Sequence, residues 1–291
     1  MNLRLNNILR NGVDPRLSLD KFKTKQVLDR SYQKYSRQYL TEKWWGEYDK
    51  NYSEKIVSGI VEAYENGREE NFQLVRESDY KYSYKSIRPI EWLDVYLKHY
   101  RVYDAKYSKT AIFRRNILRR ALAKKAFALN YTLRELGIPT IENVFYVANR
   151  GSFISRDAYY VSIAIPNSMT LTNYIDTYLS DTPRSGGLEK LSPPQVMMES
   201  GRLVANLLDK GLHIYHKELL ANILVQDPGD GQCRLKVIDL DIVEGISPFR
   251  EEKKRLALEK IRAYLVSRLG RVDADPALVE SFDEGAAPCL D

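Results

Sequence analysis

The stretch "ANILVQDPGDGQCRLKVIDLD", Ala221 to Asp241, decides the fold. Two short apolar segments flank a turn rich in Pro and Gly, a pattern that predicts a β-hairpin centred near Asp230. Pairing the two strands about this turn brings the start of the first beside the end of the second. Asn222 and Asp239 are therefore expected to be neighbours, although 17 positions separate them. An amide oxygen and a carboxylate that meet at a sheet end are suited to Mg²⁺.

Upstream of this hairpin the apolar pattern predicts strands, then a helix, then strands again. Residues 72–101 contain three alternating segments typical of strands, and leucines spaced by threes and fours predict a helix from Ser108 to Leu136, ended by Gly137 and Pro139. Two more strands are predicted within 142–165. Helical patterns dominate from there to Gly270, apart from the hairpin, so the fold class is predicted to be α/β or α+β.

The two ends of the chain differ in composition. Residues 1–68 are polar and are predicted to form a helical extension, in which the Trp44-Trp45 pair docks onto the protein body rather than onto a membrane. Residues 270–291 are predicted to be an acidic, mobile tail.

Composition and charge narrow the class of protein. The 291 residues are 44% hydrophobic and 29% charged, which is typical of a soluble globular protein and excludes wholesale disorder. No run approaches the roughly 18 apolar residues of a membrane-spanning helix, and the N-terminus lacks the apolar core of a signal peptide. A cytoplasmic protein is expected. The formal net charge of +6 suits an anionic partner, but it does not choose among nucleotide, phospholipid and nucleic acid.

Four motifs in order give a family resemblance. They are "VYLKHYR" at 95–101, "LRELGIPT" at 133–140, "GLHIYHKELLANILV" at 211–225 and "KVIDLDIV" at 236–243. Together they resemble the lipopolysaccharide kinase family, the Kdo and heptose kinases of the bacterial inner core. The resemblance covers about residues 70–268 and implies a two-lobed protein-kinase-like fold with a helical N-terminal extension. The implied N-lobe, residues 69–166, is an antiparallel sheet plus a helix, and the implied C-lobe, residues 167–269, is mainly helical.

The resemblance implies ATP and Mg²⁺ as cofactors and assigns roles to particular residues. Lys98 matches the lysine that contacts the α- and β-phosphates, and its place in an alternating strand agrees with that role. Asn222 and Asp239 match the two metal ligands, and Asp241 matches a second acid nearby. The backbone around the hinge would hold the adenine, at Ile165, Asn167 and Met169. The alternatives are a solvent-facing strand lysine, an Asn that caps a turn and an ordinary strand-end Asp.

The sequence departs from the family at two positions. The glutamate that pairs with the phosphate-binding lysine is replaced by Ala126, and Glu135 lies too far along the helix to substitute for it. In the loop before Asn222, one alignment places Lys217 at the catalytic-base position, which predicts a nucleotide-binding pseudokinase. The other places Glu218 there, in a loop one residue short, and predicts an active enzyme. We favour Glu218.

A basic segment suggests a surface partner. Between Lys109 and Arg134 there are eight basic residues and no acidic one. An anionic membrane is the favoured partner, contacted through Arg114, Arg115, Arg119, Arg120, Lys124 and Lys125. The resulting hypothesis is an ATP-dependent phosphotransferase that acts on a sugar hydroxyl of a lipid-linked acceptor. The protein is expected to be cytoplasmic and to act at the inner face of the inner membrane; the sequence does not decide whether it attaches there peripherally. An RNA-associated basic protein remains as a less favoured alternative.

Overall fold

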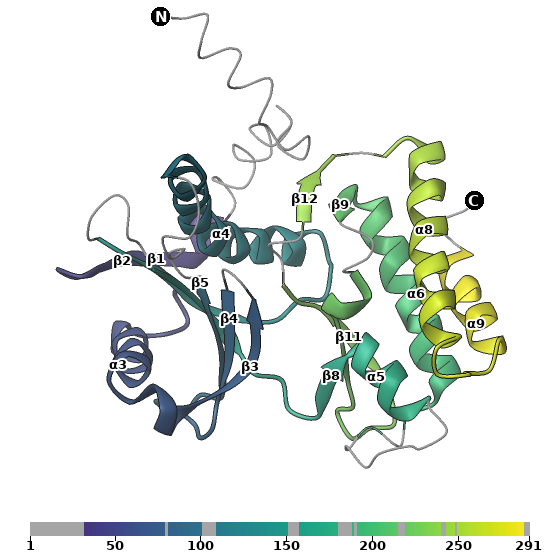
Figure 1. The fold of residues 1–291 in the computed structure, drawn as a ribbon, viewed down its shortest axis with the longest axis horizontal. Helices are drawn as coiled ribbons and strands as arrows, with labels where there is room; N and C mark the ends of the chain where they lie inside the picture. The colour runs from purple at the N-terminus through teal and green to yellow at the C-terminus, as the bar shows by residue number, and fades with distance from the viewer. Residues whose placement is uncertain are drawn as a thin grey trace, which may run out of the picture.

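The computed structural model describes residues 32–78, 81–100, 109–150, 157–179, 188, 191–214, 219–239, 243–247 and 249–287. Two groups of elements lie side by side in it, one built on a large sheet and the other rich in helices (Figure 1). The chain crosses between them after β7 (Ala158–Ile163) and before β8 (Ser168–Thr170), a segment that contains the predicted lobe boundary. The predicted two-lobed α+β architecture is confirmed.

The N-terminal lobe is a fully antiparallel seven-stranded sheet in the order β1-β2-β6-β7-β5-β4-β3. The strands other than β7 are β1 (Ser36–Leu40), β2 (Trp44–Asp49), β3 (Phe72–Ser78), β4 (Lys81–Ser86), β5 (Val95–Tyr100) and β6 (Asn143–Asn149). The predicted sequence of three strands, a helix and two strands is therefore found in β3 to β7. Strands β1 and β2 extend the sheet at the β6 edge.

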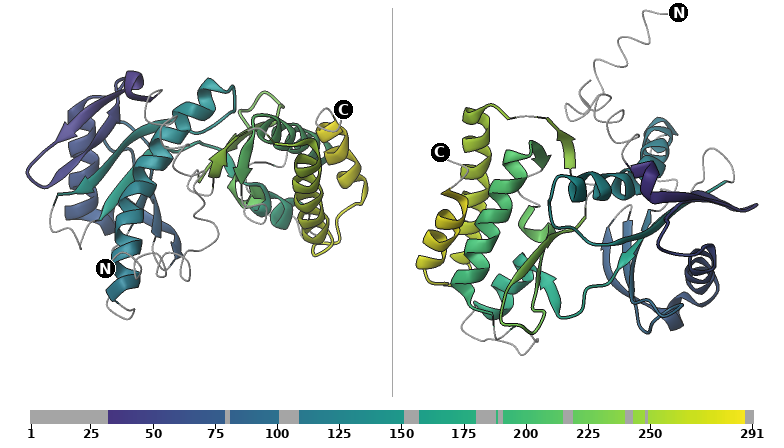
Figure 2. Two further views of the ribbon diagram at one scale, coloured as in Figure 1. Left: turned by 90° about the horizontal axis from the view of Figure 1, so that it is seen from above. Right: turned by 180° about the vertical axis from the view of Figure 1, so that it is seen from behind.

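Two helices cover opposite faces of this sheet (Figure 2). Helix α3 (Glu54–Asn71) packs its apolar residues, including Ile60 and Tyr64, on the outer face. Helix α4 (Lys109–Glu135) packs on the inner face, which looks toward the second lobe. Because successive side chains of a strand point to opposite faces, neighbouring residues of β5 belong to different cores. Leu97 lies in the outer apolar cluster, whereas Tyr100 lies in the inner one.

The prediction of a wholly helical segment before residue 68 is wrong for residues 36–49, which form the β1–β2 hairpin. Acidic side chains make this hairpin look too polar in the sequence to form strands. In the structure these side chains accept hydrogen bonds from tyrosine hydroxyls. The carboxylate of Glu47 accepts hydrogen bonds from the hydroxyls of Tyr32 (3.0 Å) and Tyr146 (2.8 Å). The carboxylate of Asp49 accepts one from Tyr131 of α4 (2.6 Å). These bonds satisfy acidic groups that would otherwise be costly to bury.

The predicted docking of the tryptophan pair onto the protein body is confirmed. Trp44 is buried in the outer core, with its ring centroid 4.7 Å from that of Tyr159. Trp45 points to the other face of β2 and meets the ring of Tyr146 edge-on at 6.1 Å. Alternation along the strand therefore places one indole on each face of the sheet.

The C-terminal lobe contains a small sheet and packed helices. Its three-stranded sheet has the order β11-β10-β8, with β10 at Ile223–Gln226 and β11 at Arg234–Val237. Strands β9 (Leu212–Ile214) and β12 (Val243–Ile246) form a second pair. The helical elements are α5 (Leu171–Tyr178), α6 (Pro193–Asp209), η2 (Leu220–Asn222), α8 (Glu251–Leu269) and α9 (Ala277–Ala286). Among the described helices, none combines the length and apolarity needed to cross a bilayer.

The prediction of a mobile tail after residue 270 is wrong for α9. This helix lies along α6 and buries Leu278 and Phe282 against it. Glycines let the two backbones approach closely, since a Cβ at Gly201 would overlap the carbonyl oxygen of Phe282, and one at Gly285 would overlap that of Met198. The close approach anchors the end of the described chain to the C-terminal lobe.

This helix contact predicts a large effect from a single methyl group. Gly285→Ala should lower the free energy of unfolding by about 1 to 3 kcal/mol, because the new Cβ forces the two backbones apart. Gly270→Ala is the matched control, since its Cβ would meet Val266 O at an ordinary 3.4 Å. That control should stay within about 0.5 kcal/mol of wild type. Urea unfolding followed by circular dichroism measures both, and equal stabilities would contradict the close packing.

Candidate functional site

The hairpin predicted around Asp230 forms with the expected register. Strands β10 and β11 pair antiparallel with Ile223 opposite Val237 and Gln226 opposite Arg234. The ladder continues one step further, where the Ile238 amide donates to the Asn222 carbonyl oxygen at 2.8 Å. Asp239 follows directly. The predicted neighbourhood of Asn222 and Asp239 at the end of this sheet is therefore confirmed at the level of the backbone.

The backbone turns sharply at Asp239, where φ is +56°. This left-handed conformation is uncommon outside glycine, and Asp is among the residues that tolerate it best. Just before it, the Val237 amide donates to the Pro139 carbonyl oxygen (2.9 Å), and Val237 forms a parallel bridge with Thr140. The connection between α4 and β6 therefore braces the strand that presents Asp239.

Lys98 lies on β5 and reaches across the lobes to Asp239. Its side chain is 13% exposed, and Nζ is 2.9 Å from Asp239 Oδ1. The contact is an ion pair without directed hydrogen-bond geometry, so the buried ammonium has no hydrogen-bond acceptor among the described residues. An ammonium carries three donors, which leaves capacity here for another anion. A solvent-facing lysine is therefore excluded, and phosphate binding by Lys98 stays a prediction.

An aromatic ring contacts Lys98, for which the family resemblance predicts a glutamate partner. Lys98 pairs with Tyr160 across β5 and β7, and its Nζ is 5.9 Å from the centroid of that ring. The Tyr160 hydroxyl donates to Asn143 Oδ1 at 2.7 Å, and Asn143 Nδ2 donates to the Phe127 carbonyl oxygen of α4 at 2.9 Å. Lys98 is thus tied to α4 through a cation–π contact and two hydrogen bonds.

Helix α4 presents no glutamate to Lys98. Ala126, at the position expected for the glutamate, is buried in the inner core. Glu135 is at the far end of the helix, where its carboxylate pairs with Lys34 at 2.6 Å and accepts from the Tyr35 hydroxyl at 3.2 Å. It is the sole acidic residue in the sequence of α4. The helix therefore offers no carboxylate to Lys98.

Sequence reasoning missed a second lysine at this site. Lys81 is the first residue of β4, and its Nζ donates to both oxygens of Asp239, at 3.0 Å and 2.8 Å. Because β4 pairs with β5, with Ser83 opposite Lys98, Lys81 and Lys98 project from the same face of the sheet. The only local signal was alternation in "KYSYKS", which does not tell the inner face from the outer one.

Charge and burial oppose each other in this cluster. Burial is the main cause that lowers the pKa of Lys98 to about 8; the attraction of Asp239 opposes this shift, and the nearby charge of Lys81 adds to it. For Asp239, burial alone would raise the pKa, but the ammonium groups of Lys98 and Lys81 outweigh it and hold the pKa of the carboxyl well below its ordinary range. Asp239 is therefore ionised at neutral pH. Lys98 is undercompensated, which favours an additional anion beside it.

The predicted hinge lies where the chain changes sheets. Ile165 is buried, and its carbonyl oxygen accepts from the Ser168 hydroxyl at 2.7 Å. Asn167 is exposed with φ of +47°, and its carbonyl oxygen accepts from the Asp227 amide at 3.0 Å. Met169 is in β8, opposite Val225. These bonds fix the segment between the lobes, and adenine binding by its backbone stays a prediction.

The catalytic-base question lies outside the described residues. Lys217 and Glu218 fall in the segment 215–218, and Asp241 in 240–242, between β11 and β12. The role predicted for Glu218 therefore stays a prediction, as does that of Asp241. The described elements on either side, β9 and η2, fix where this loop begins and ends.

The described donors suit Mg²⁺ held jointly with phosphate. Among the described residues, no three His, Cys, Asp or Glu side chains are grouped as they would be around a metal bound by protein alone. Mg²⁺ commonly takes one or two protein oxygens and completes its shell with water and phosphate. The carboxylate of Asp239 and the amide oxygen of the buried Asn222 are donors of this kind. Metal binding at Asp239 stays a prediction, and it would compete with the two lysines for the same oxygens.

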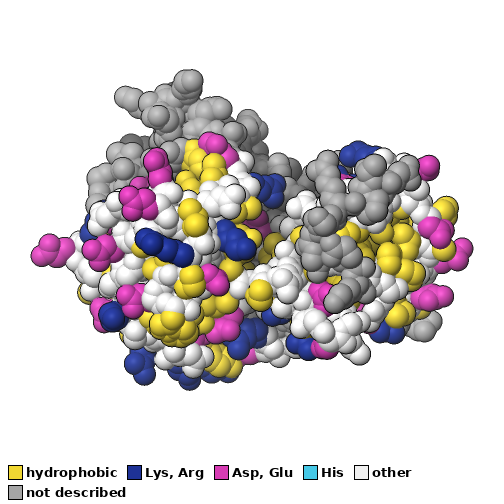
Figure 3. Space-filling view, turned by 90° about the horizontal axis from the view of Figure 1, so that it is seen from below, with side chains coloured by type: hydrophobic (Ala, Val, Ile, Leu, Met, Phe, Trp, Pro, Cys, Tyr) yellow, Lys and Arg dark blue, Asp and Glu magenta, His cyan; other side chains and the backbone are white. Residues whose placement is uncertain are grey.

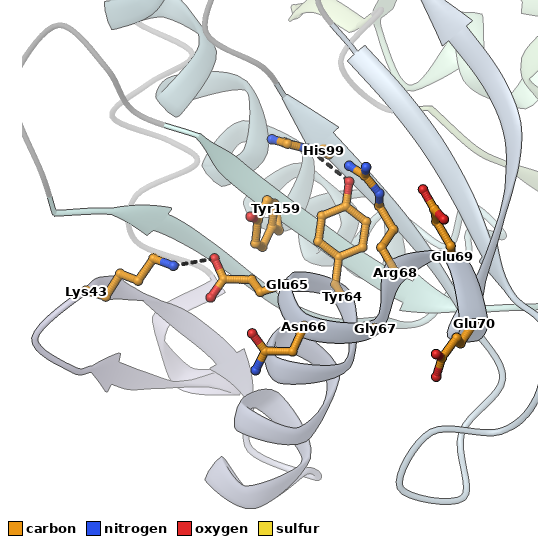
Figure 4. Close-up of a pocket in the computed structure, with 10 residues that line it drawn as sticks. All are labelled: Lys43, Tyr64, Glu65, Asn66, Gly67, Arg68, Glu69, Glu70, His99 and Tyr159. Atoms are coloured by element: carbon orange, nitrogen blue, oxygen red, sulfur yellow. Dashed lines mark hydrogen bonds and ion pairs between the residues drawn. The ribbon is translucent and has the colours of Figure 1, made fainter.

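A cavity of about 610 Å³ lies on the opposite face of the sheet (Figure 4). It is lined by the end of α3, by Lys43 and by the outward-facing His99 and Tyr159. His99 Nδ1 is hydrogen-bonded to the Tyr64 hydroxyl at 2.9 Å, and Lys43 pairs with Glu65 at 2.6 Å. Since His99 follows Lys98 in β5, the sheet separates this cavity from the Lys98 cluster. The cavity is therefore not part of the candidate site.

A comparison with known protein families identifies the family of this chain. The sequence model of the lipopolysaccharide kinase (Kdo/WaaP) family matches residues 68–277. A solved structure, WaaP in complex with acyl carrier protein, is similar over 74% of this chain and 78% of that chain, with 15% sequence identity and a TM-score of 0.46. No curated protein sequence matches the chain.

The cluster contains two ammonium groups and one carboxylate, so loss of the carboxylate and loss of one lysine should change the free energy of unfolding by different amounts. Asp239→Asn leaves the buried ammonium of Lys98 without a carboxylate, so it should lower the free energy of unfolding by about 3 to 5 kcal/mol. Lys98→Met leaves Asp239 paired with Lys81 and removes a poorly compensated charge. It should cost less than about 1 kcal/mol or stabilise the protein. Thermal and urea unfolding provide the test, and a Lys98→Met variant as unstable as Asp239→Asn would contradict it.

Proposed function

Because the chain belongs to the lipopolysaccharide kinase (Kdo/WaaP) family, and is a kinase by that membership, we propose that it transfers the γ-phosphoryl group of ATP to a hydroxyl of a lipid-linked inner-core sugar. The observation that supports this most directly is the meeting of Lys98, from the N-terminal sheet, with Asp239, beside Asn222 in the C-terminal lobe. Two lobes thus contribute a cation and hard oxygen ligands to one place, as phosphoryl transfer requires.

In the proposed reaction each residue has a defined task. Lys98 binds the α- and β-phosphates, Asn222 and Asp239 hold Mg²⁺, and the backbone near Ile165, Asn167 and Met169 holds the adenine. Bound Mg²⁺ supplies charge neutralisation at the phosphate oxygens. Glu218 accepts the proton of the acceptor hydroxyl as its oxygen bonds to the γ-phosphorus, the bond from that phosphorus to the bridging oxygen breaks, and ADP leaves.

We further propose a cytoplasmic protein that attaches peripherally to the inner membrane through α4. The basic residues Arg114, Arg115, Arg119 and Arg120 fall in the part of α4 whose side chains lie outside the described residues. Lys124 is half-buried, with Nζ 5.8 Å from the Tyr32 ring centroid, so this proposal rests mainly on the arginines. On the face in Figure 3, described basic and acidic side chains are interspersed.

A phosphotransfer assay tests the reaction. Purified protein with Mg-ATP should phosphorylate a lipid acceptor bearing Kdo or heptose, detected by mass spectrometry of the acceptor. Lys98→Met should lower the rate about 100-fold or more, because it removes a cation that stabilises charge in the transition state. Lys85→Met, on the exposed part of β4, is the matched control and should be as active as wild type. Nucleotide binding without any product would refute the proposed transfer and favour a pseudokinase.

Two variants decide which residue is the base. Glu218→Gln should reduce the rate about 100-fold or more, since it removes the proton acceptor while it preserves size. Lys217→Ala should leave most of the activity. The reverse pattern would assign the base position to Lys217 and refute our alignment of the loop.

Vesicle co-sedimentation tests attachment. Binding to vesicles with anionic lipid should weaken as salt rises, because the attraction is screened. Replacing Arg114, Arg115, Arg119 and Arg120 with Gln should weaken binding by at least about tenfold. A control with equal charge loss replaces four exposed basic residues elsewhere, namely Lys85, Arg88, Lys253 and Arg255. If both quadruple variants bind alike, α4 is not the attachment surface.

A further inference from the structure

Lys81 occupies a position that the family resemblance leaves without a role. Its side chain is 9% exposed, and its ammonium holds both oxygens of Asp239 from a strand 158 residues away in the sequence. Burying a lysine requires compensation, and here the compensation is the same carboxylate that compensates Lys98. Two lysines from adjacent strands therefore converge on one acidic group at the junction of the lobes.

Lys81 is the first residue of β4, and the two residues that join β3 to β4 lie outside the described part of the chain. Glycine-rich segments of nucleotide-binding proteins let backbone amides approach the phosphates closely. Residues 72–86 of this sequence contain no glycine. The sequence here therefore does not favour phosphate recognition by a closely approaching backbone, whereas the ammonium group of Lys81 can provide the positive charge instead.

The sheet places Lys81 and Lys98 for joint action. Lys81 pairs with Tyr100 and Ser83 pairs with Lys98, so the two lysines are diagonal neighbours on the inner face. Both ammonium groups lie within 3.0 Å of Asp239 Oδ1. One carboxylate oxygen is thus close to two cations. A phosphate group or a diphosphate presents several such oxygens and is an apt ligand for a pair of this kind.

We propose that Lys81 is a second phosphate-contacting residue of the nucleotide site, acting with Lys98 on the polyphosphate of ATP. In the nucleotide-free protein, Asp239 holds both lysines in place as an internal anion. When nucleotide binds, its phosphate oxygens take over the two ammonium groups. The inference rests on the proposed function and deepens it, because it assigns polyphosphate recognition to a side chain in a part of the sequence that contains no glycine.

Isothermal titration of the full-length protein with Mg-ATP, Mg-ADP and adenosine tests the role of Lys81. Lys81→Met should weaken ATP and ADP binding at least about tenfold, and adenosine binding should change less than about twofold. Lys85→Met is the matched control, since it removes an exposed lysine from the same face of β4, and its affinities should equal those of wild type.

Each other outcome overturns the inference. Wild-type affinity for ATP in Lys81→Met, or an equal loss of ATP and adenosine binding, would make Lys81 a purely structural residue while the proposed function stands. A wild-type protein that binds no nucleotide would overturn the proposed function as well. If Lys81→Met does not fold, as judged by near-ultraviolet circular dichroism, Lys81→Gln replaces it under the same criteria.

A second measurement removes the metal and the adenosine. With a chelator present, inorganic pyrophosphate should bind Asp239→Asn about tenfold more tightly than wild type, because the competing carboxylate has lost its charge. Adding Lys81→Met to Asp239→Asn should abolish that gain. A gain that persists in the double variant would show that Lys98 alone binds the anion and would overturn the role of Lys81.

Discussion

The ion pairs of Asp239 with Lys81 and Lys98 are the constraint on which the site depends. They join the inner face of the N-terminal sheet to the end of the β10–β11 hairpin, and they are buried where the lobes meet. Opposite charges in such a place attract strongly, but each also loses hydration. The cluster is therefore better suited to holding groups in position than to adding stability. This agrees with the direction of the Lys98 pKa shift, in which burial prevails over attraction.

Around this cluster, a tyrosine ring supports the buried lysine for which a glutamate partner was expected. Tyr160 supports Lys98 with its ring and links it to α4 through Asn143. Other tyrosines of the inner core donate their hydroxyls to Glu47 and Asp49 of β2. A tyrosine can fill an apolar core and still satisfy a buried polar group. The abundance of this residue in the chain, 21 in all, thus has a structural explanation in the first lobe.

The parts of the fold that the sequence predicts are those with local signals. The hairpin around Asp230 is specified by its turn, and α4 ends as expected at Gly137, which has φ of +73°. The contact between Lys81 and Asp239 has no local signal, because it depends on the order of strands in a sheet and on the placement of a second lobe. Helix α9 did carry a signal in the spacing of Leu278, Phe282 and Gly285, but the acidic composition of the tail outweighed it.

The order of the strands also constrains how the chain can fold. Strand β2 pairs with β6, so Trp44 must meet Asn149 across more than a hundred intervening residues, which include α3, three strands and α4. Contacts between such distant residues are slow to form, because the conformational entropy of a long loop is lost before the new contacts can compensate for it. During synthesis, β1 and β2 are the first described strands to be made, and among the described strands they have only each other to pair with until β6 is made. The earliest described strands of this protein are therefore among the last to be secured in its sheet.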